Sequence, residues 1–228
     1  MTDESSKTRA VRGQDFESKY LRGRVIDIGC GPDLIVPHAE PFDVADGDAQ
    51  EIANLRAHEA YDAVCSSHCL EHMKDVPKAL RQWWKLVRKG GYMILVVPDE
   101  DLYEQGGWPS LFNRDHKATF RLGGHMSWSP ASYDIAELVG QLECAEIVSC
   151  VRQDQGYNYS LQRFKLTRVH RVLYRTQQLS CGLAHALGMR SESQIRTIKG
   201  LFQKLGAPVD QTQNSALAQI QVILRKGH

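Results

Sequence analysis

Three short apolar runs in the first hundred residues predict buried strands. They are RVIDIG (24–29), YDAVCSS (61–67) and GYMILVVP (91–98). Between the last two lies DVPKALRQWWKLVRKGG (75–91), which Asp75 can cap and Gly90-Gly91 can end. Its apolar positions have helical spacing: Val76, Ala79, Leu80, Trp83, Leu86 and Val87. A strand, a helix and a strand with short joins predict a parallel crossover and an α/β fold.

The rest of the chain predicts additions to one domain. We expect a flexible lead-in over residues 1–20 and a single domain over 21–228. After Pro98, the aromatic and polar stretch 99–130 is too long for an ordinary connection, which favours an ordered lid. A helix around 131–142 and a strand around 145–151 follow. A helical insertion over 160–206 precedes a last strand at 216–226, where apolar residues alternate.

Composition narrows the class of protein. The chain has 28 Lys and Arg against 27 Asp and Glu, which argues against a general electrostatic grip on nucleic acid. Its six cysteines form no C-x-x-C pair and resemble reduced thiols of a cytosolic protein. The polar first twenty residues lack the apolar core of a signal peptide, and no apolar run is long enough to span a bilayer. We therefore expect a cytoplasmic location.

The stretch VIDIGCGPD (25–33) carries the strongest functional signal. A strand ends at Asp27, and Gly29 and Gly31 allow a sharp turn and a close approach to a ligand. A dinucleotide fingerprint would continue with a third glycine and a phosphate-binding helix. Here prolines follow at positions 32, 37 and 41 instead. The loop therefore predicts a nucleoside-like ligand without phosphates.

With its neighbours, this loop resembles motif I of class I S-adenosylmethionine-dependent methyltransferases. DGDAQEI (46–52) is similar to the adenine-binding turn of that family, YDAVCSSHCLEHM to its fourth strand and following helix, and LVRKGGYMILVVP to its hairpin into strand five. The resemblance covers roughly residues 22–100. It implies a three-layer sandwich with a seven-stranded, mostly parallel sheet whose last strand is antiparallel. Asp33 and Lys89 depart from the motifs, and the short span between Gly31 and Asp48 implies that the first helix is reduced to a turn.

The same resemblance assigns the cofactor site. It implies that S-adenosylmethionine is bound at its amino-acid end by the loop after strand one and at its ribose by an acid after strand two. Asp43 is the first choice for the ribose, with Asp46 as a rival. The complete set of implied cofactor residues is Asp27, Gly29, Cys30, Gly31, Asp43, Asp48, Ala49 and Ser67.

Methyl transfer to a hydroxyl requires a base, whereas a neutral amine needs none. The base should come from the loops at the carboxyl ends of strands four and five. His116, beside Asp115, is our first choice, and His68 is the second. A histidine that only packs or caps a loop is the alternative for each.

The stretch SSHCLEHM (66–73) also raises the question of a metal. Its candidate ligands come from one junction, whereas structural zinc sites pair ligand clusters from separate turns, so we expect no zinc. SHCLEH resembles a stretch in quinone-biosynthesis O-methyltransferases that can hold a divalent ion. His68 replaces its first glutamate, which leaves Glu71 and His72 and makes an oxygen-ligand site less favourable. We expect no metal.

The acceptor is predicted less sharply. SSHC stands where base-modifying nucleic-acid methyltransferases carry a [D/N/S]-P-P-[Y/F] motif, which disfavours nucleic acid. The lid resembles a block found in small bacterial methyltransferases of polysaccharide or glycan pathways, and its aromatics can stack on sugars. We expect O-methylation of a sugar or glycan-linked small molecule. Methylation at nitrogen or at a phenol or quinone hydroxyl, and a non-catalytic scaffold, are the alternatives.

The insertion 160–206 has a partial apolar face opposite basic residues: Lys165, Arg168, Arg171 and Arg175. Such a stretch fits a membrane surface or an anionic acceptor, but the pattern favours a solvated helix face or a dimer contact. Peripheral membrane contact is therefore left open, and so is the choice between a monomer and a homodimer.

Overall fold

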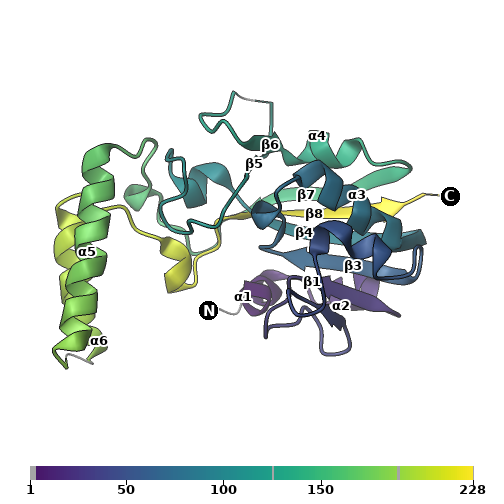
Figure 1. Ribbon diagram of the computed structural model, residues 1–228, viewed down its shortest axis with the longest axis horizontal. Coiled ribbons are helices and arrows are strands. Elements are labelled where there is room, and N and C mark those ends of the chain that lie inside the picture. The colour runs from purple at the N-terminus through teal and green to yellow at the C-terminus, as the bar shows by residue number, and fades with distance from the viewer. Residues whose placement is uncertain (1–3, 125, 189–190, 228) are drawn as a thin grey trace.

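Six strands form one mixed sheet in the order β2-β1-β3-β4-β8-β7 (Figure 1). The computed structural model describes residues 4–124, 126–188 and 191–227. Strands β1 to β4 run parallel, whereas β8 runs antiparallel to both β4 and β7. This confirms the predicted α/β class and the antiparallel last strand. The strand bounds are β1 (Val25–Ile28), β2 (Glu40–Phe42), β3 (Tyr61–Ser67), β4 (Val87–Pro98), β7 (Ala145–Gln153) and β8 (Gln219–Lys226).

The expectation of a seven-stranded sheet is wrong. Only residues 43–60 separate β2 from β3, and they form a turn and the short helix η1 (Ala49–Asn54). A parallel crossover takes a dozen or more residues, and a further strand here would need two crossovers. The three-residue strand β2 therefore forms the edge of the sheet. A separate two-stranded parallel sheet pairs β5 (Thr119–Arg121) with β6 (Ser132–Asp134).

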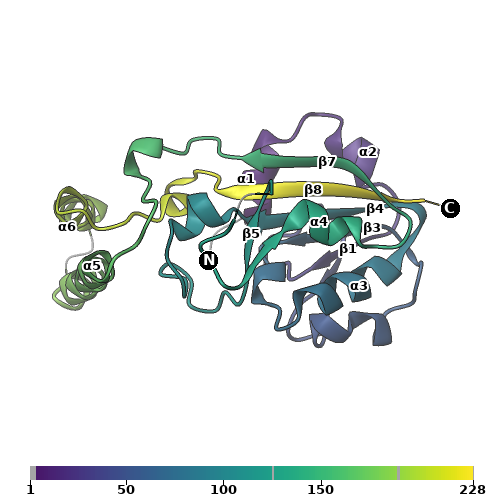
Figure 2. The same ribbon diagram turned by 90° about the horizontal axis from the view of Figure 1, so that it is seen from above.

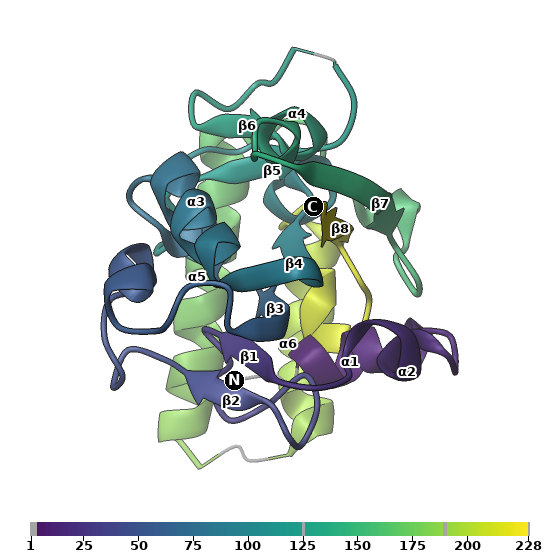
Figure 3. The ribbon, with the colours of Figure 1, turned by 90° about the vertical axis from the view of Figure 1, so that its right-hand side faces the viewer.

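Helices cover both faces of the sheet, but unequally (Figures 2 and 3). On one face, α3 (Val76–Leu86) and α4 (Ile135–Gly140) enclose the larger apolar core. On the other lie α1 (Glu4–Val11), α2 (Phe16–Tyr20) and the loop after β1. That loop contains no helix between positions 29 and 39, as its prolines predict.

Residues 4–20 lie against the sheet and the glycine loop. Thr8 is buried, and its Oγ1 accepts a hydrogen bond of 2.9 Å from Nε2 of Gln219 on β8. The backbone N–H and hydroxyl of Ser6 donate to the carboxylate of Asp33 at 2.8 and 2.6 Å. Helix α1 therefore forms a wall beside the loop that the sequence assigns to the cofactor.

Asp75 caps α3 as the sequence predicts. Its Oδ1 accepts a hydrogen bond of 2.9 Å from the backbone N–H of Lys78, with Pro77 in the first turn. The helix ends at Leu86 instead of reaching Gly90, because Val87 already pairs with Tyr61 of β3. The helix is thereby fixed behind the β3–β4 pair.

The segment 99–130 folds over the carboxyl ends of the parallel strands. It begins with one helical turn, η3 (Glu100–Glu104), in which both glutamates are buried. Oε2 of Glu100 accepts from Thr119 Oγ1 at 2.9 Å and from Ser127 Oγ at 3.0 Å. These contacts tie η3 to β5 and to the later part of the same segment. Tyr103 and His116 of this segment line one cavity with Gly29 and Gly31 of the glycine loop.

Helices α5 (Arg168–Ala186) and α6 (Glu192–Lys204) pair with each other at one end of the molecule, away from the sheet (Figure 1). The short helix η4 (Tyr159–Leu161) precedes α5, and η5 (Gln211–Asn214) leads from α6 back to β8. Within the described ranges, no helix combines the length and apolar character needed to cross a bilayer.

Candidate active site

Two adjoining cavities lie at the carboxyl ends of the parallel strands and share Gly29. The larger is about 610 Å³ and the smaller about 420 Å³. Gly29 and Gly31 have φ values of +72° and +52°, in the left-handed region that favours glycine. The backbone can therefore turn sharply here and leave room for a ligand across both cavities.

The smaller cavity contains the residues assigned to the ribose and adenine: Asp43, Asp48 and Ala49. One carboxylate oxygen of Asp43 accepts from the backbone N–H of Gly31 at 2.8 Å, which joins the end of β2 to the glycine loop. The rival, Asp46, accepts from the backbone N–H of Asp43 at 2.9 Å and supports that turn. This geometry favours Asp43 as the ribose residue.

The larger cavity contains four other assigned cofactor residues: Gly29, Cys30, Gly31 and Ser67. Asp27 belongs to neither set of lining residues, because it is 1% exposed and lies beneath the loop. Its Oδ2 accepts from the backbone N–H of Ile35 at 2.7 Å. Asp27 therefore holds the loop in place, and direct contact with the cofactor remains a prediction.

The structure separates the predicted pair Asp115 and His116. His116 is buried, and its Nδ1 is 2.7 Å from Oε1 of Glu104. A carboxylate can only accept a hydrogen bond, so Nδ1 carries the proton and the lone pair of Nε2 points away from Glu104. The exposed Asp115 carboxylate lies 3.0 Å from Nδ1 of His72, an ion-pair distance without hydrogen-bond alignment.

His68 is paired with a buried carboxylate. Its Nδ1 is 3.5 Å from Oε1 of Glu71, and its Nε2 is 3.0 Å from Oε1 of Gln219. Burial alone would lower the pKa of His68, but the contact with Glu71 outweighs it and raises the pKa to about 9. An imidazole protonated at neutral pH cannot accept another proton, which argues against His68 as the base.

The cysteines do not gather into a metal site. Cys65 packs in the apolar cluster on one face of the sheet and Cys69 in the cluster on the other. The side chains that do converge are Glu71, His72 and His116, whose ligand atoms lie within 4.8 Å of one another. These three face the larger cavity, together with Tyr103 and Asn113.

Several residues of the site were not predicted from the sequence. Glu104 has no neighbouring motif, and its partnership with His116 exists only because η3 turns back on the lid. Val44 and Met73 supply apolar wall to the smaller cavity, and Val44 is 90% exposed. The one signal in the sequence for this apolar wall was Val44 itself, a single valine beside an acidic turn. Of the lid aromatics, Tyr103 lines the larger cavity, whereas Phe120 is in the core.

The profile of a methyltransferase domain matches residues 10–138, more than half of the chain. No curated protein matches the sequence. Among solved structures, a SAM-dependent methyltransferase from Archaeoglobus fulgidus has a TM-score of 0.51 and 15% identity, over 99% of this chain and 95% of that one. Phosphoethanolamine N-methyltransferase 2 of Haemonchus contortus, solved with S-adenosyl-L-methionine, has a TM-score of 0.46 and 11% identity, over 90% of this chain and 49% of that one. This chain therefore belongs to the methyltransferase-domain family, and its cofactor is S-adenosylmethionine.

Proposed function

We propose that this methyltransferase acts on a hydroxyl of a sugar or glycan-linked small molecule. The observation that carries the proposal is the buried Glu104–His116 pair in the wall of the larger cavity. An amine acceptor needs only to be neutral, whereas a hydroxyl must lose its proton as it attacks. A site built for a hydroxyl therefore needs a group such as His116 beside the methyl donor.

The cofactor occupies the smaller cavity and part of the larger one, and the acceptor occupies the rest of the larger cavity. The smaller cavity takes the adenosine of S-adenosylmethionine, which supplies the methyl group. The larger cavity takes its amino-acid end beside Gly31 and leaves the region around His116 for the acceptor. Polar side chains line this region as a sugar would require, with one aromatic face: Tyr103, Asn113, Asp210, Thr212 and Gln213.

The test is a methyl-transfer assay with a labelled cofactor and a panel of sugars, glycan-linked alcohols, phenols and amines. We expect label on a sugar hydroxyl oxygen. His116→Asn should lower turnover at least about 100-fold, because activation of the hydroxyl is lost, while the affinity for S-adenosylhomocysteine stays unchanged. His185→Asn, an exposed histidine on α5, serves as the control and should retain full turnover.

Other outcomes contradict the proposal in distinct ways. Label on nitrogen, or on a phenol alone, would replace the sugar hydroxyl with the other acceptor class. Cofactor binding without turnover on any acceptor would favour a non-catalytic scaffold. Full turnover of His116→Asn would remove His116 from the mechanism.

A further inference from the structure

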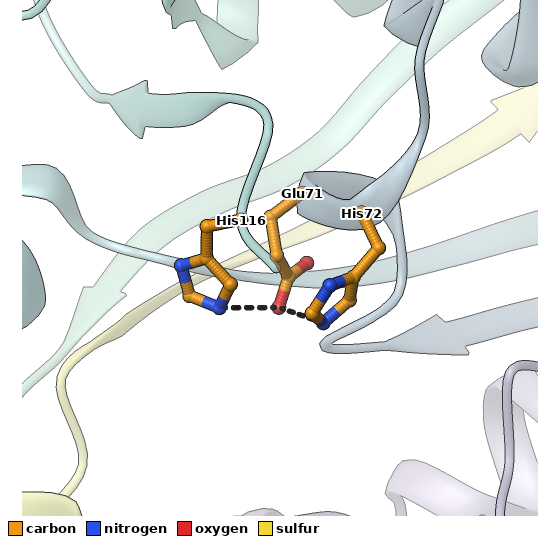
Figure 4. A group of neighbouring side chains, drawn as sticks. All are labelled: Glu71, His72 and His116. Carbon is orange, nitrogen blue, oxygen red and sulfur yellow. Dashed lines mark ion pairs between the residues drawn. The ribbon is translucent and has the colours of Figure 1, made fainter. Parts of the chain in front are cut away.

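Three side chains from two segments meet in the wall of the larger cavity (Figure 4). Glu71 and His72 belong to η2 (Leu70–His72), directly after β3, and His116 comes from the lid. Oε1 of Glu71 lies 3.9 Å from Nε2 of His72 and 3.9 Å from Nε2 of His116. Two imidazole nitrogens and a carboxylate oxygen therefore face one point.

A carboxylate lies beside the far nitrogen of each ring. Nδ1 of His116 is 2.7 Å from Glu104, and Nδ1 of His72 is 3.0 Å from Asp115. Histidines that bind metals usually present their second nitrogen to such a group, which fixes the ring and leaves Nε2 free to coordinate. Within this cluster His116 has that arrangement as a hydrogen bond, whereas His72 has the Asp115 carboxylate at ion-pair distance only.

Glu71 supplies an independent observation. It is 1% exposed, and neither carboxylate oxygen has a hydrogen-bond partner within the described part of the chain. The nearest groups are the three histidines, all at ion-pair distances of 3.5 to 3.9 Å. The charge of His68 offsets only part of the cost of burying this carboxylate without hydrogen bonds, and a bound cation would offset the rest.

We propose that Glu71, His72 and His116 bind a divalent transition-metal ion such as Mn²⁺ or Zn²⁺. Imidazole nitrogens suit Zn²⁺ and a carboxylate oxygen suits Mn²⁺, whereas Mg²⁺ and Ca²⁺ prefer sites made of oxygen ligands. Three ligands from the protein leave coordination positions open toward the cavity for an acceptor oxygen. The sequence predicts no metal, because its candidate ligands come from one junction and His68 replaces the first glutamate of the divalent-ion motif. His116, distant along the chain, was not among those candidates.

The catalytic meaning of the ion rests on the proposed function. An acceptor hydroxyl bound to the ion would release its proton to water more readily. Its oxygen would then form a bond to the methyl carbon, while the carbon–sulfur bond breaks and its electron pair stays on sulfur. His116 would then hold the ion as a ligand and would not itself take the proton, so loss of its side chain is still expected to lower turnover.

The test measures binding of Mn²⁺ by the loss of its free-ion paramagnetic resonance signal, on chelator-treated protein without cofactor or acceptor. We expect one Mn²⁺ per chain, displaced by Zn²⁺. The isosteric change Glu71→Gln and the change His116→Asn should each weaken binding at least about tenfold. His185→Asn and Cys144→Ser, at exposed positions, should leave binding unchanged.

Circular dichroism of each variant reports whether the fold is retained. The proposal is overturned if neither Mn²⁺ nor Zn²⁺ binds at one ion per chain, or if both Glu71→Gln and His116→Asn bind as the wild type does. Absence of metal binding with intact sugar methylation would reject this inference alone. Metal binding with methylation only at nitrogen would reject the proposed function alone.

A separate observation concerns the face of α5 that no part of the described chain covers. Its exposed apolar residues recur every three, four or seven positions, so they form one stripe along the helix. Monomeric soluble proteins seldom expose so continuous an apolar stripe. The residues and their exposed fractions are Val169 (66%), Val172 (61%), Leu179 (74%), Leu183 (62%) and Leu187 (72%).

Charge indicates what covers this stripe. Residues 160–206 hold nine of the 28 Lys and Arg but one of the 27 Asp and Glu, so the rest of the chain is net acidic. Within the described residues, no ion pair involves a Lys or Arg of this segment. In a symmetric dimer joined through this stripe, the excess positive charges of the two copies would repel each other. Nucleic acid would complement the charge but would leave the apolar stripe uncovered. An anionic bilayer complements both features.

We infer that the α5–α6 pair docks on an anionic lipid surface. The test is sedimentation of the full chain with neutral phosphatidylcholine vesicles and with vesicles containing 30% phosphatidylglycerol as the chosen anionic probe. We expect binding to the anionic vesicles only, weakened by salt. Leu179→Asp with Leu183→Asp should abolish it, whereas Val148→Asp on β7 should not.

Equal binding to both vesicle types, or none to either, overturns this inference. So does unchanged binding of the Leu179→Asp, Leu183→Asp variant. A homodimer that the same two changes dissociate would assign the stripe to a second copy, and tighter binding to duplex DNA than to vesicles would assign the charge to nucleic acid.

Discussion

Gly29→Ala is expected to weaken binding of S-adenosylmethionine by about 100-fold while the chain still folds. A Cβ atom at position 29 would lie 2.4 Å from Sγ and 2.5 Å from Cβ of Cys69. Cys69 is buried in the larger core, so it cannot retreat. The loop must shift instead, and the φ of +72° adds backbone strain. A displacement of about 1 Å can cost on the order of 100-fold, and calorimetric titration would measure the loss.

Gly90→Ala is the matched control for this prediction. Gly90 has a φ of +74°, but a Cβ atom there meets nothing within 4 Å. The backbone strain is therefore similar and the clash is absent, so we expect about 1 kcal/mol of lost stability and unchanged cofactor affinity. Restored affinity in Gly29→Ala with Cys69→Gly would locate the effect in the clash. Wild-type affinity of Gly29→Ala alone would show that the loop does not hold the cofactor.

The fold could be predicted in those segments where the spacing of apolar residues is compatible with only one kind of secondary structure. Apolar runs of six to eight residues separated by a capped amphipathic helix gave the parallel β3–α3–β4 unit correctly. The number of strands could not be predicted from the family pattern, because it depends on a count of residues between β2 and β3. That span is too short for a strand and two crossovers, and it formed η1 instead.

In the candidate site too, some residues could be predicted from the sequence and others could not. Local motifs predicted a glycine loop beside a cavity, since glycines and acids at strand ends act through backbone turns close in sequence. The partners of His116 and His72 were not predictable, because they depend on how the lid folds back. Asp115 is next to His116 in sequence, yet consecutive side chains in a loop diverge, and Asp115 faces His72. Glu104 reaches His116 across twelve positions of chain.

Asp27 couples the cofactor loop to the stability of the fold. Its carboxylate lies in the centre of the sheet, where β1 pairs with β2 and β3. Oδ2 accepts from Ile35, but Oδ1 is buried without a hydrogen-bond partner. Burial raises the pKa of Asp27 to about 7, against the opposing effects of the Ile35 N–H and the charge of Arg12.

The consequence for stability follows from the two pKa values of Asp27. The unfolded chain releases this proton near pH 4, and the folded protein releases it near pH 7. Between these values the folded state holds the proton more tightly, so ionisation lowers the free energy of unfolding as the pH rises. The loss begins near pH 4 and is complete above pH 7. The wild-type protein therefore carries a buried, costly negative charge at pH 8.

Asp27→Asn is thus expected to stabilise the cofactor-free protein at pH 8 and not at pH 4. The amide oxygen can still accept from Ile35, and the neutral side chain avoids the cost of burying a charge. We expect a gain of about 2 kcal/mol at pH 8, smaller than the full shift implies because the amide N–H₂ lacks a partner. Urea unfolding at both pH values measures it. Asp15→Asn, at an exposed carboxylate, controls for the loss of one charge, and an equal effect of Asp27→Asn at pH 4 and pH 8 would contradict the buried charge as its cause.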